Sequence, residues 1–292
     1  MSTSRFSAED SPQGQAHGAA YRATLVAAMT YEVVPLSTVE AAIEALPATS
    51  RVSVTCSPVK GIEATMELTD QIRSRGHQAV PHLAARMVES PQQLAMVAAW
   101  LRSEGINEVF VIGGDAEVPL GPYPDALTLL RDLLAKDTGL TGVGVTAYPD
   151  SHPLIEPAAL HHSLHAKQSL LAEVGIEGYA STQMCFDGAK ISDWLHTERK
   201  QGLTLPIHLG LAGVVDRAKL MSMGVRLGVG TSLRFLRKNR AAVGRLLTTS
   251  SYDPGLLLEE LSPILEPYAV TGIHCFTFNQ VEATAQWQQA AR

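Results

Sequence analysis

Short β-branched runs alternate with amphipathic helical stretches along the chain from Tyr21 onward. This alternation is typical of βα units that build a parallel sheet. The strands are expected near Thr24–Val33, Val52–Thr55, Ala79–His82, Val109–Ile112, Val143–Ala147, Tyr179–Gln183, Pro206–Leu209 and Gly272–Phe276. Eight strands alternating with helices predict a single closed (βα)8 TIM barrel over residues 21–292, and a doubly wound open sheet is the alternative.

Two segments between these strands have the apolar spacing of helices, namely Ile62–Arg75 and Pro91–Ser103. A glycine follows each of them, Gly76 and Gly105, as is common at a helix C-terminus. The long interval from Ala212 to Ala269 is interpreted as an insertion before the last strand. Residues 1–20, rich in Ser, Gln, Gly and Ala, are expected to form a flexible tail.

The composition of the chain limits the classes of molecule that it is expected to bind. The 292 residues carry a net charge of −6 and no long basic run, which argues against nucleic-acid binding by phosphate neutralisation and favours a small metabolite. Cys56, Cys185 and Cys275 are odd in number and far apart, which fits a reducing cytoplasm rather than a disulfide framework. The chain shows no apolar run near the roughly 20 residues of a membrane span, so no membrane partner is expected.

The candidate functional residues lie at the ends of the predicted strands. The run from Val109 to Ile112 reads as a buried strand, and Gly113, Gly114 and Asp115 follow it directly. The active site of a parallel barrel is built at the carboxyl ends of its strands. The polar residues at those ends are Glu32, Thr55, His82, Asp115, Tyr148, Gln183, His208 and then His274 or Asn279.

Each of these residues also has a plain structural interpretation, such as a solvated carboxylate at Glu32, a loop hydrogen bond at His82 or backbone contacts at Gln183. A histidine group, His161, His162 and His165, has helical spacing that could hold a metal ion. A solvated helix face explains that group equally well, and the sequence indicates no carboxylate that would complete the ligand set.

The strand-end residues belong to longer motifs that occur in a fixed order. They are Tyr31-Glu32-Val33-Val34-Pro35, Val54-Thr55, Pro81-His82-Leu83, Gly114-Asp115, Ala147-Tyr148-Pro149-Asp150-Ser151-His152-Pro153, Thr182-Gln183-Met184-Cys185-Phe186-Asp187 and Gly272-Ile273-His274-Cys275-Phe276-Thr277-Phe278-Asn279. In order and spacing these segments resemble the methylenetetrahydrofolate reductase family across nearly the whole chain. The Tyr-Pro-x-x-His-Pro and Thr-Gln-x-x-Phe-Asp segments are together the most specific.

The resemblance implies an enzyme that reduces 5,10-methylenetetrahydrofolate to 5-methyltetrahydrofolate with NADH or NADPH. An acid must first protonate N10, which opens the five-membered ring and leaves an N5-methylene iminium that accepts a hydride. The resemblance gives this role to Glu32, and partial burial suits a carboxylic acid that donates near neutral pH. It places Asp115 and Gln183 on the pterin, with Phe186 and Phe276 as further substrate contacts. The residues expected to line the cofactor cleft are Thr55, His82, Gly114 and Tyr148.

The chain departs from the family where most members bind FAD. An arginine of the family is Gly113 here, and a lysine eleven residues before the glutamine is Ala172, with Lys167 just over one helical turn earlier. The tyrosine of the last motif is Phe276. Charge-assisted hydrogen bonds contribute on the order of 1.5–3 kcal/mol each, so these losses predict weak FAD binding or none. Hydride would then pass directly from NADH to the iminium carbon.

The role of one basic group and the function of the protein each leave alternatives open. The basic group Arg234, Arg237, Lys238 and Arg240 is either a solvated helix face or a contact for an anion, such as a cofactor pyrophosphate or the glutamate tail of a folate. The rival function is a metal-dependent TIM-barrel hydrolase, whose ligands would be His82, His208, His274 and Asp115. A catalytically inactive folate-binding barrel is a third alternative, against which the presence of Glu32 speaks.

Overall fold

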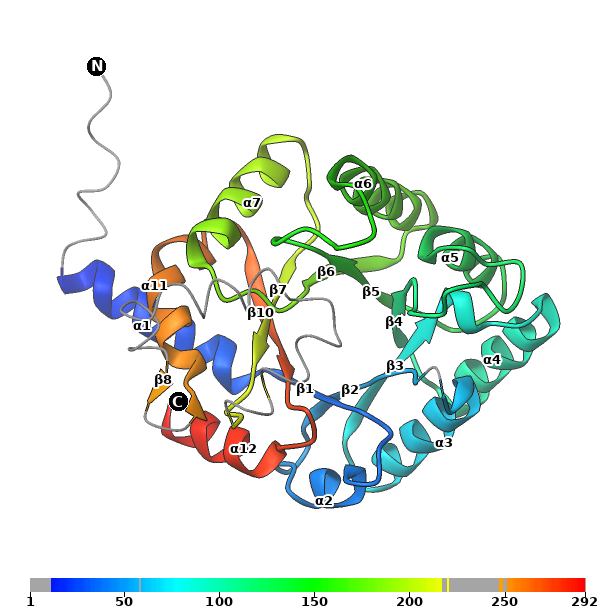
Figure 1. The fold of residues 1–292 in the computed structure, drawn as a ribbon, viewed down its shortest axis with the longest axis horizontal. Helices are drawn as coiled ribbons and strands as arrows, with labels where there is room; N and C mark the ends of the chain where they lie inside the picture. The colour runs from blue at the N-terminus through cyan, green and yellow to red at the C-terminus, as the bar shows by residue number, and fades with distance from the viewer. Residues whose placement is uncertain (1–11, 58, 217–219, 221–246, 249–250, 292) are drawn as a thin grey trace.

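Eight parallel strands close into a barrel in the order β1-β10-β7-β6-β5-β4-β3-β2 (Figure 1). The computed structural model describes residues 12–57, 59–216, 220, 247–248 and 251–291. The barrel strands are β1 Thr30–Val33, β2 Arg51–Val54, β3 Gln78–Ala84, β4 Glu108–Ile112, β5 Gly142–Ala147, β6 Glu177–Thr182, β7 Ile207–Ala212 and β10 Val270–Phe276. The (βα)8 TIM barrel predicted from the alternation of strands and helices is confirmed.

Helices surround this barrel (Figure 1). They are α1 Pro12–Ala27, α2 Val39–Glu44, α3 Gly61–Ser74, the short 3-10 helix η1 Ala85–Met87, α4 Pro91–Glu104, α5 Ala126–Leu134, α6 Pro157–Val174, α7 Gly188–Lys200, α11 Pro254–Leu265 and α12 Val281–Ala290. The prediction that Gly76 and Gly105 mark helix C-termini is confirmed, because both have positive φ angles at the ends of α3 and α4. Among the described residues, every helix is too short or too polar to span a membrane.

The N-terminal prediction needs correction, because Pro12–Ala27 forms a helix. This helix includes part of the expected tail and the first four residues of the strand predicted at Thr24–Val33. Its alanines favour a helix, and tertiary contacts hold it, since Leu25 and Val26 are buried and the Tyr21 hydroxyl donates to the carbonyl of Val270 over 2.9 Å. Residues 1–11 lie outside the described residues.

The interval between β7 and β10 contains a small antiparallel pair, β8 Leu247–Thr248 and β9 Ser251–Tyr252, followed by α11. The predicted insertion is therefore present in part. The basic group Arg234, Arg237, Lys238 and Arg240 lies outside the described residues.

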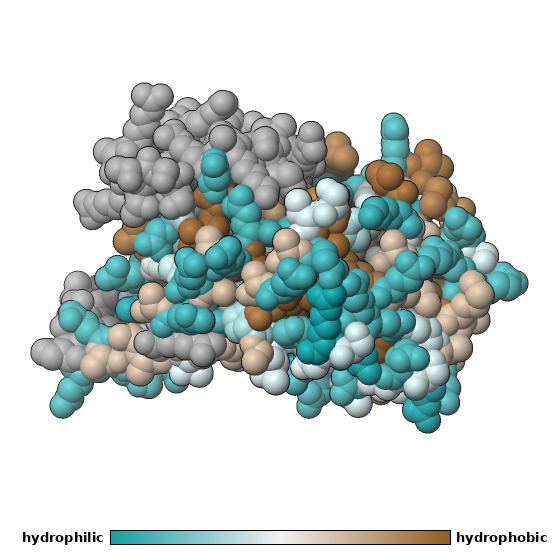
Figure 2. Space-filling view, turned by 90° about the horizontal axis from the view of Figure 1, so that it is seen from below, coloured by the Kyte–Doolittle hydropathy of each residue, from teal (hydrophilic) through white to brown (hydrophobic). Residues whose placement is uncertain are grey.

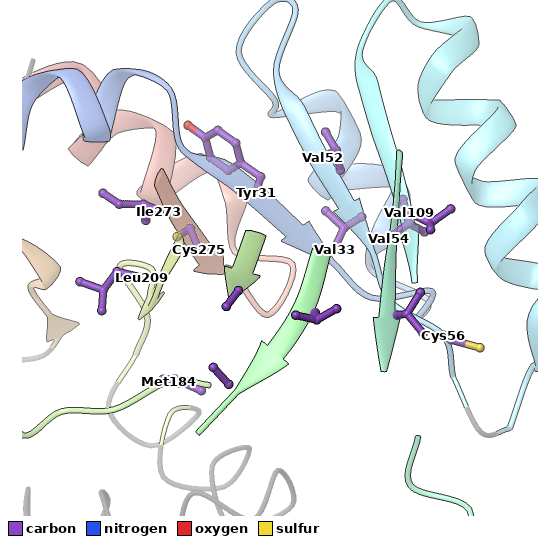
Figure 3. Close-up of a cluster of buried hydrophobic side chains, with 14 of the residues drawn as sticks. Tyr31, Val33, Val52, Val54, Cys56, Val109, Met184, Leu209, Ile273 and Cys275 are labelled. Atoms are coloured by element: carbon purple, nitrogen blue, oxygen red, sulfur yellow. The ribbon is translucent and has the colours of Figure 1, made fainter. Parts of the chain in front are cut away.

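The apolar core lies between the strands and the helices. Alternate residues of a strand point to opposite faces, and in this barrel the outward set is apolar. Figure 3 shows that set as a cluster that includes Tyr31, Val33, Val52, Val54, Val109, Leu209, Ile273 and Cys275. The inward set is polar and aromatic. Glu32 contacts His274, Ser53 contacts His82, and the Phe110 ring lies against both histidines. The fold thus places polar and ionisable side chains on the barrel axis, away from the apolar core.

Candidate active site

Glu32, His274, His82 and Ser53 form a cluster inside the barrel. Nε2 of His274 lies 2.9 Å from Oε2 of Glu32, and Nε2 of His82 lies 2.6 Å from the hydroxyl oxygen of Ser53. The two imidazole rings are 6.1 Å apart, centroid to centroid. Since β3 and β10 are not neighbours in the barrel, this approach crosses the interior.

The depth of each group in this cluster differs. The His274 side chain is 3% exposed, whereas the Glu32 side chain is 13% exposed and reaches toward the carboxyl ends of the strands. Burial, and secondarily the neighbouring His274, holds the pKa of His82 well below its ordinary value. His82 is therefore neutral at physiological pH. The cluster offers one carboxyl group backed by imidazoles, which is the arrangement of a supported acid or base.

The segment after β10 fixes the loop that carries Glu32. The Thr277 hydroxyl donates to the carbonyl of Glu32 over 2.6 Å. The Asn279 amide donates to the carbonyl of Val34 and accepts from its N–H, each over 2.9 Å. Phe278 and Asn279 have φ angles of 52° and 60°, a left-handed conformation that costs energy in residues other than glycine. Asn279, considered above only as an alternative strand-end group, thus acts as a clamp on β1.

The turn after β4 places Asp115 at the rim. Gly114 has a φ of +87°, and a Cβ there would lie 3.0 Å from Cβ of Ala84, so the position requires glycine. Asp115 is exposed. It lies close enough to Tyr148 that its charge adds to burial in raising the pKa of that phenol. The Tyr148 ring in turn meets His152 edge-on at 5.3 Å. Asp115 therefore lies within electrostatic range of Tyr148 at the carboxyl end of the barrel.

Thr55 sits at the carboxyl end of β2 with a hydroxyl that finds no hydrogen-bond partner among the described residues. Its backbone N–H is satisfied by the carbonyl of Val33 at 3.0 Å. A buried hydroxyl without a partner is uncommon, because it loses its bonds to water without replacement. Thr55 is therefore a candidate ligand contact, as the sequence suggested.

Exposed apolar side chains surround the same end of the barrel. The loops that follow β1, β2, β4 and β5 carry Leu36, Val59, Val118, Leu120, Leu154 and Ile155, all exposed. Figure 2, a side view, shows apolar residues gathered along one edge of the molecule. Such a patch is typical of a surface that binds a partly apolar ligand.

Two predicted contacts, His82 and Phe186, lie deeper than expected. His82 belongs to the barrel interior and not to an open cofactor cleft, since it is 3% exposed. Phe186 is 1% exposed and packs edge-on against Tyr252 at 5.3 Å, so it is a core residue whose ring presents no surface to a substrate. Gln183, by contrast, is partly exposed directly after β6, and its side-chain oxygen accepts from the neighbouring N–H of Met184 over 2.8 Å. Short motifs indicate where a chain segment lies but not how deep its side chains point.

Phe276 is partly buried, with its ring 5.0 Å from that of His274. It therefore lies over the interior cluster, where a ligand entering the barrel mouth would meet it.

His208 was expected at the carboxyl end of its strand, and this expectation is wrong. Because β7 runs from Ile207 to Ala212, His208 lies near the start of the strand, at the opposite end of the barrel from Asp115. Its ring stacks on Tyr179 at 4.0 Å, and both line a cavity of about 380 Å³ together with Arg51 and Glu108. Arg51 and Glu108 pair across this amino-terminal end. Burial, and secondarily the charge of Arg51, lowers the pKa of His208 to about 3. His208 and Asp115 therefore do not join His82 and His274.

The two positions at which the resemblance led us to expect flavin contacts, Gly113 and Ala172, lie at opposite ends of the barrel. Ala172 is exposed near the end of α6, and that end leads to the amino terminus of β6, on the face away from the site. Its identity therefore has no bearing on the carboxyl face. Lys167 is 3% exposed, and burial lowers its pKa to about 8 against the opposing charge of Asp125. Gly113 does lie at the carboxyl end of β4, and a Cβ there would meet nothing within 4 Å.

A scan of protein families finds no model that matches the chain. Among solved structures, a GH20 β-N-acetylhexosaminidase from Streptomyces coelicolor A3(2) aligns with a TM-score of 0.34 and 12% identity, over 63% of this chain and 47% of that chain. The alignment thus spans about half of the hexosaminidase. A variant of the actinorhodin polyketide ketoreductase with NADPH aligns with a TM-score of 0.27 and 13% identity, over 88% of this chain and 98% of that chain. Both scores are too low to bear on function.

Proposed function

We propose that this protein reduces 5,10-methylenetetrahydrofolate to 5-methyltetrahydrofolate, with NADH or NADPH as the hydride donor. The observation that carries the proposal is the partly exposed carboxyl group of Glu32, held on the barrel axis by His274. The family resemblance of the strand-end motifs supplies the reaction. The proposal rests on a site whose acid, rim carboxylate and apolar surround suit a folate.

In this reaction Glu32 donates its proton to N10 of the substrate. The bond between N10 and the bridging carbon breaks, and the electron pair of N5 forms the iminium. A hydride from the nicotinamide then adds to that carbon and leaves a methyl group on N5. His274 would donate a hydrogen bond to the carboxylate that remains on Glu32, which stabilises the charged form. A proton from solvent restores the acid.

In this proposal, side chains at the carboxyl end of the barrel bind the pterin ring. The exposed carboxylate of Asp115 can accept hydrogen bonds from the N–H groups of the pterin ring. Gln183, whose amide oxygen is turned to Met184, presents its NH₂ group as a donor. Phe276 offers an aromatic surface above His274. Correct placement of the reacting carbon by such contacts contributes several kcal/mol to catalysis.

FAD fits this site poorly. Gly113 replaces the arginine that the family resemblance assigns to FAD, and among the described residues Arg86 and Lys190, two cations at the carboxyl end of the barrel, are engaged with other protein groups. Arg86 donates to the carbonyls of Ala116, Glu117 and Pro124, and Lys190 pairs with Asp150. Because any dinucleotide carries a pyrophosphate, this arrangement argues against a tightly held FAD and is compatible with a dinucleotide that is exchanged at each turnover. We therefore propose direct transfer from the dinucleotide, with contacts from Thr55, Gly114 and Tyr148.

The test is an absorption spectrum of the purified protein followed by an anaerobic assay of NADH and NADPH oxidation with methylenetetrahydrofolate. Each assay is run with and without added FAD, and Glu32→Gln is the matched control. Turnover by a colourless protein without FAD, lost in the control, supports the proposal. Turnover that requires FAD overturns direct transfer, and no turnover under either condition overturns the reductase assignment.

A second candidate is a metal-assisted hydrolase. Glu32, His82 and His274 each offer one ligand atom, and these atoms all lie within 4.8 Å of one another. Such a set can hold an ion that activates water. The separation of His208 and Asp115 from this cluster removes two of the ligands that the sequence suggested. Metal content that falls in Glu32→Gln, together with hydrolase activity that is lost on chelation, distinguishes this candidate from the reductase.

A further inference from the structure

A second cluster of metal-binding side chains lies in the outer helical layer, between α6 and α7. Nδ1 of His161 and Nε2 of His165 each lie 2.9 Å from the same atom, Oε2 of Glu198. The two imidazole centroids are 4.2 Å apart. His161 and His165 are one helical turn apart on α6, so they share a face, and α7 supplies the carboxylate that the sequence pattern lacked.

The position of Glu198 is unusual for a carboxylate. Its side chain is only 9% exposed, while His161 and His165 are 37% and 20% exposed. A buried carboxylate is costly unless it is paired, and both imidazoles are directed at one of its oxygens. A single positive centre placed among these three atoms would satisfy all of them at once.

The chemistry of this donor set is that of a transition-metal site. Two imidazole nitrogens and one carboxylate oxygen are common ligands of Zn²⁺ in sites that keep a position open for water. Bond lengths of about 2.0–2.1 Å in a tetrahedron put neighbouring ligand atoms about 3.3 Å apart. The three atoms here lie within 4.8 Å of one another, so small side-chain rotations suffice.

The cluster also has space for an ion and a route to solvent. A cavity of about 180 Å³ adjoins the cluster and is lined by His161 and Glu198 together with Tyr148, Leu164 and Trp194. An ion can enter from solvent along the exposed edge of His161, and water in this cavity can complete its coordination.

We propose that His161, His165 and Glu198 bind one divalent transition-metal ion of the Zn²⁺ class, which joins α6 to α7. This site is separate from the cluster on the barrel axis and does not depend on the proposed reductase activity. An ion held by ligands from two helices stabilises the folded state, because the unfolded chain does not hold those ligands together.

The test uses protein without a histidine tag, stripped of metal with a chelator. Equilibrium dialysis against ZnCl₂ gives stoichiometry and affinity, Co²⁺ absorption reports tetrahedral coordination, and thermal unfolding is followed with and without Zn²⁺. His161→Gln and His165→Gln remove ligands. His162→Ala is the matched control on the same helix, and Glu32→Gln removes the barrel cluster.

We expect one equivalent of Zn²⁺ in the wild type, His162→Ala and Glu32→Gln. In His161→Gln and His165→Gln the affinity should fall beyond the about 10–100-fold loss typical of outer-shell changes, and the thermal shift should disappear. Absence of binding in the wild type overturns the proposal. So does binding that survives His165→Gln, or that is lost in Glu32→Gln, since the ion would then lie on the barrel axis.

Discussion

Glu32 and His274 are diagonal neighbours on two paired strands. β1 and β10 align Thr30 with His274 and Glu32 with Phe276, so His274 lies one layer deeper in the barrel than Glu32. Its Nε2 reaches up to Oε2 of Glu32 over 2.9 Å. The candidate acid is thus supported from below, while Phe276 stands beside it at the level of the barrel mouth.

Replacing Glu32 with Gln should abolish reduction while leaving folate affinity nearly unchanged. The amide keeps the shape and the hydrogen bond to His274 but has no proton to donate at N10. Steady-state turnover and a folate binding titration measure the two properties separately. Normal turnover in this variant would show that another group is the acid.

Replacing Asn279 with Ala should destabilise the protein by about 1–3 kcal/mol and lower turnover, because the clamp on Val34 is lost. Urea unfolding and kinetics measure these effects. Asn279→Gly is the control that also removes the clamp but tolerates the φ of 60°, so the difference between the two variants isolates backbone strain. Unchanged stability in both variants would mean that Asn279 does not hold the loop.

Acid should weaken the fold through His208, whose pKa lies near 3 in the folded state and near 6.5 when unfolded. Above the unfolded value both states are neutral. Between the two values only the unfolded chain binds the proton, so the free energy of unfolding falls as the pH falls. The slope for this one group is at most about 1.4 kcal/mol per pH unit.

Urea unfolding of the wild type and His208→Phe across this range measures that slope. The variant keeps a ring to stack on Tyr179 but does not titrate. Its stability should fall less steeply, with His82 and the carboxylates still contributing equally to both proteins. Parallel curves would show that His208 is protonated in the folded state or is not sequestered from water.

Introducing arginine at Gly113 should strengthen flavin binding. A Cβ there meets nothing within 4 Å, so the first atom of the new side chain is accommodated without a clash. One charge-assisted hydrogen bond of about 1.5–3 kcal/mol corresponds to roughly a tenfold to hundredfold gain in affinity. Fluorescence titration with FAD measures it, and Gly113→Gln controls for size. Equal affinities in the arginine and glutamine variants would remove Gly113 as the reason for weak binding.

The sequence predicts the barrel because the strands, and helices such as α3 and α4, carry local signals. The alternation of apolar runs located all eight strands, and glycine marked the ends of α3 and α4. The helix α1 was missed because a segment rich in small and polar residues resembles a tail until α11 and β10 pack against it. Local pattern cannot report contacts made across more than two hundred residues.

Except for His208, which lies at the amino-terminal end, the sequence located the candidate residues at the carboxyl ends of the strands, but it did not give the depth of their side chains. Glu32 and Asp115 are at the carboxyl end of the barrel, as expected for residues that follow strands in a parallel barrel. His82 and Phe186 are buried instead, because the direction of a side chain depends on register and neighbours. Glu198 could not be identified from the sequence as a partner of His165, because the two side chains come into contact only when α6 and α7 pack together.

The division of each strand into an apolar outward set and a polar inward set has a consequence for how this chain can change. Tyr31 and Glu32 are adjacent in sequence, yet one anchors to α12 through Gln288 and the other faces the barrel mouth. Substitutions at neighbouring positions should therefore fall into two separate phenotypes, one of folding yield and one of chemistry. Such a scaffold can acquire or lose a reaction by changes along its axis while the outer ring continues to specify the same fold.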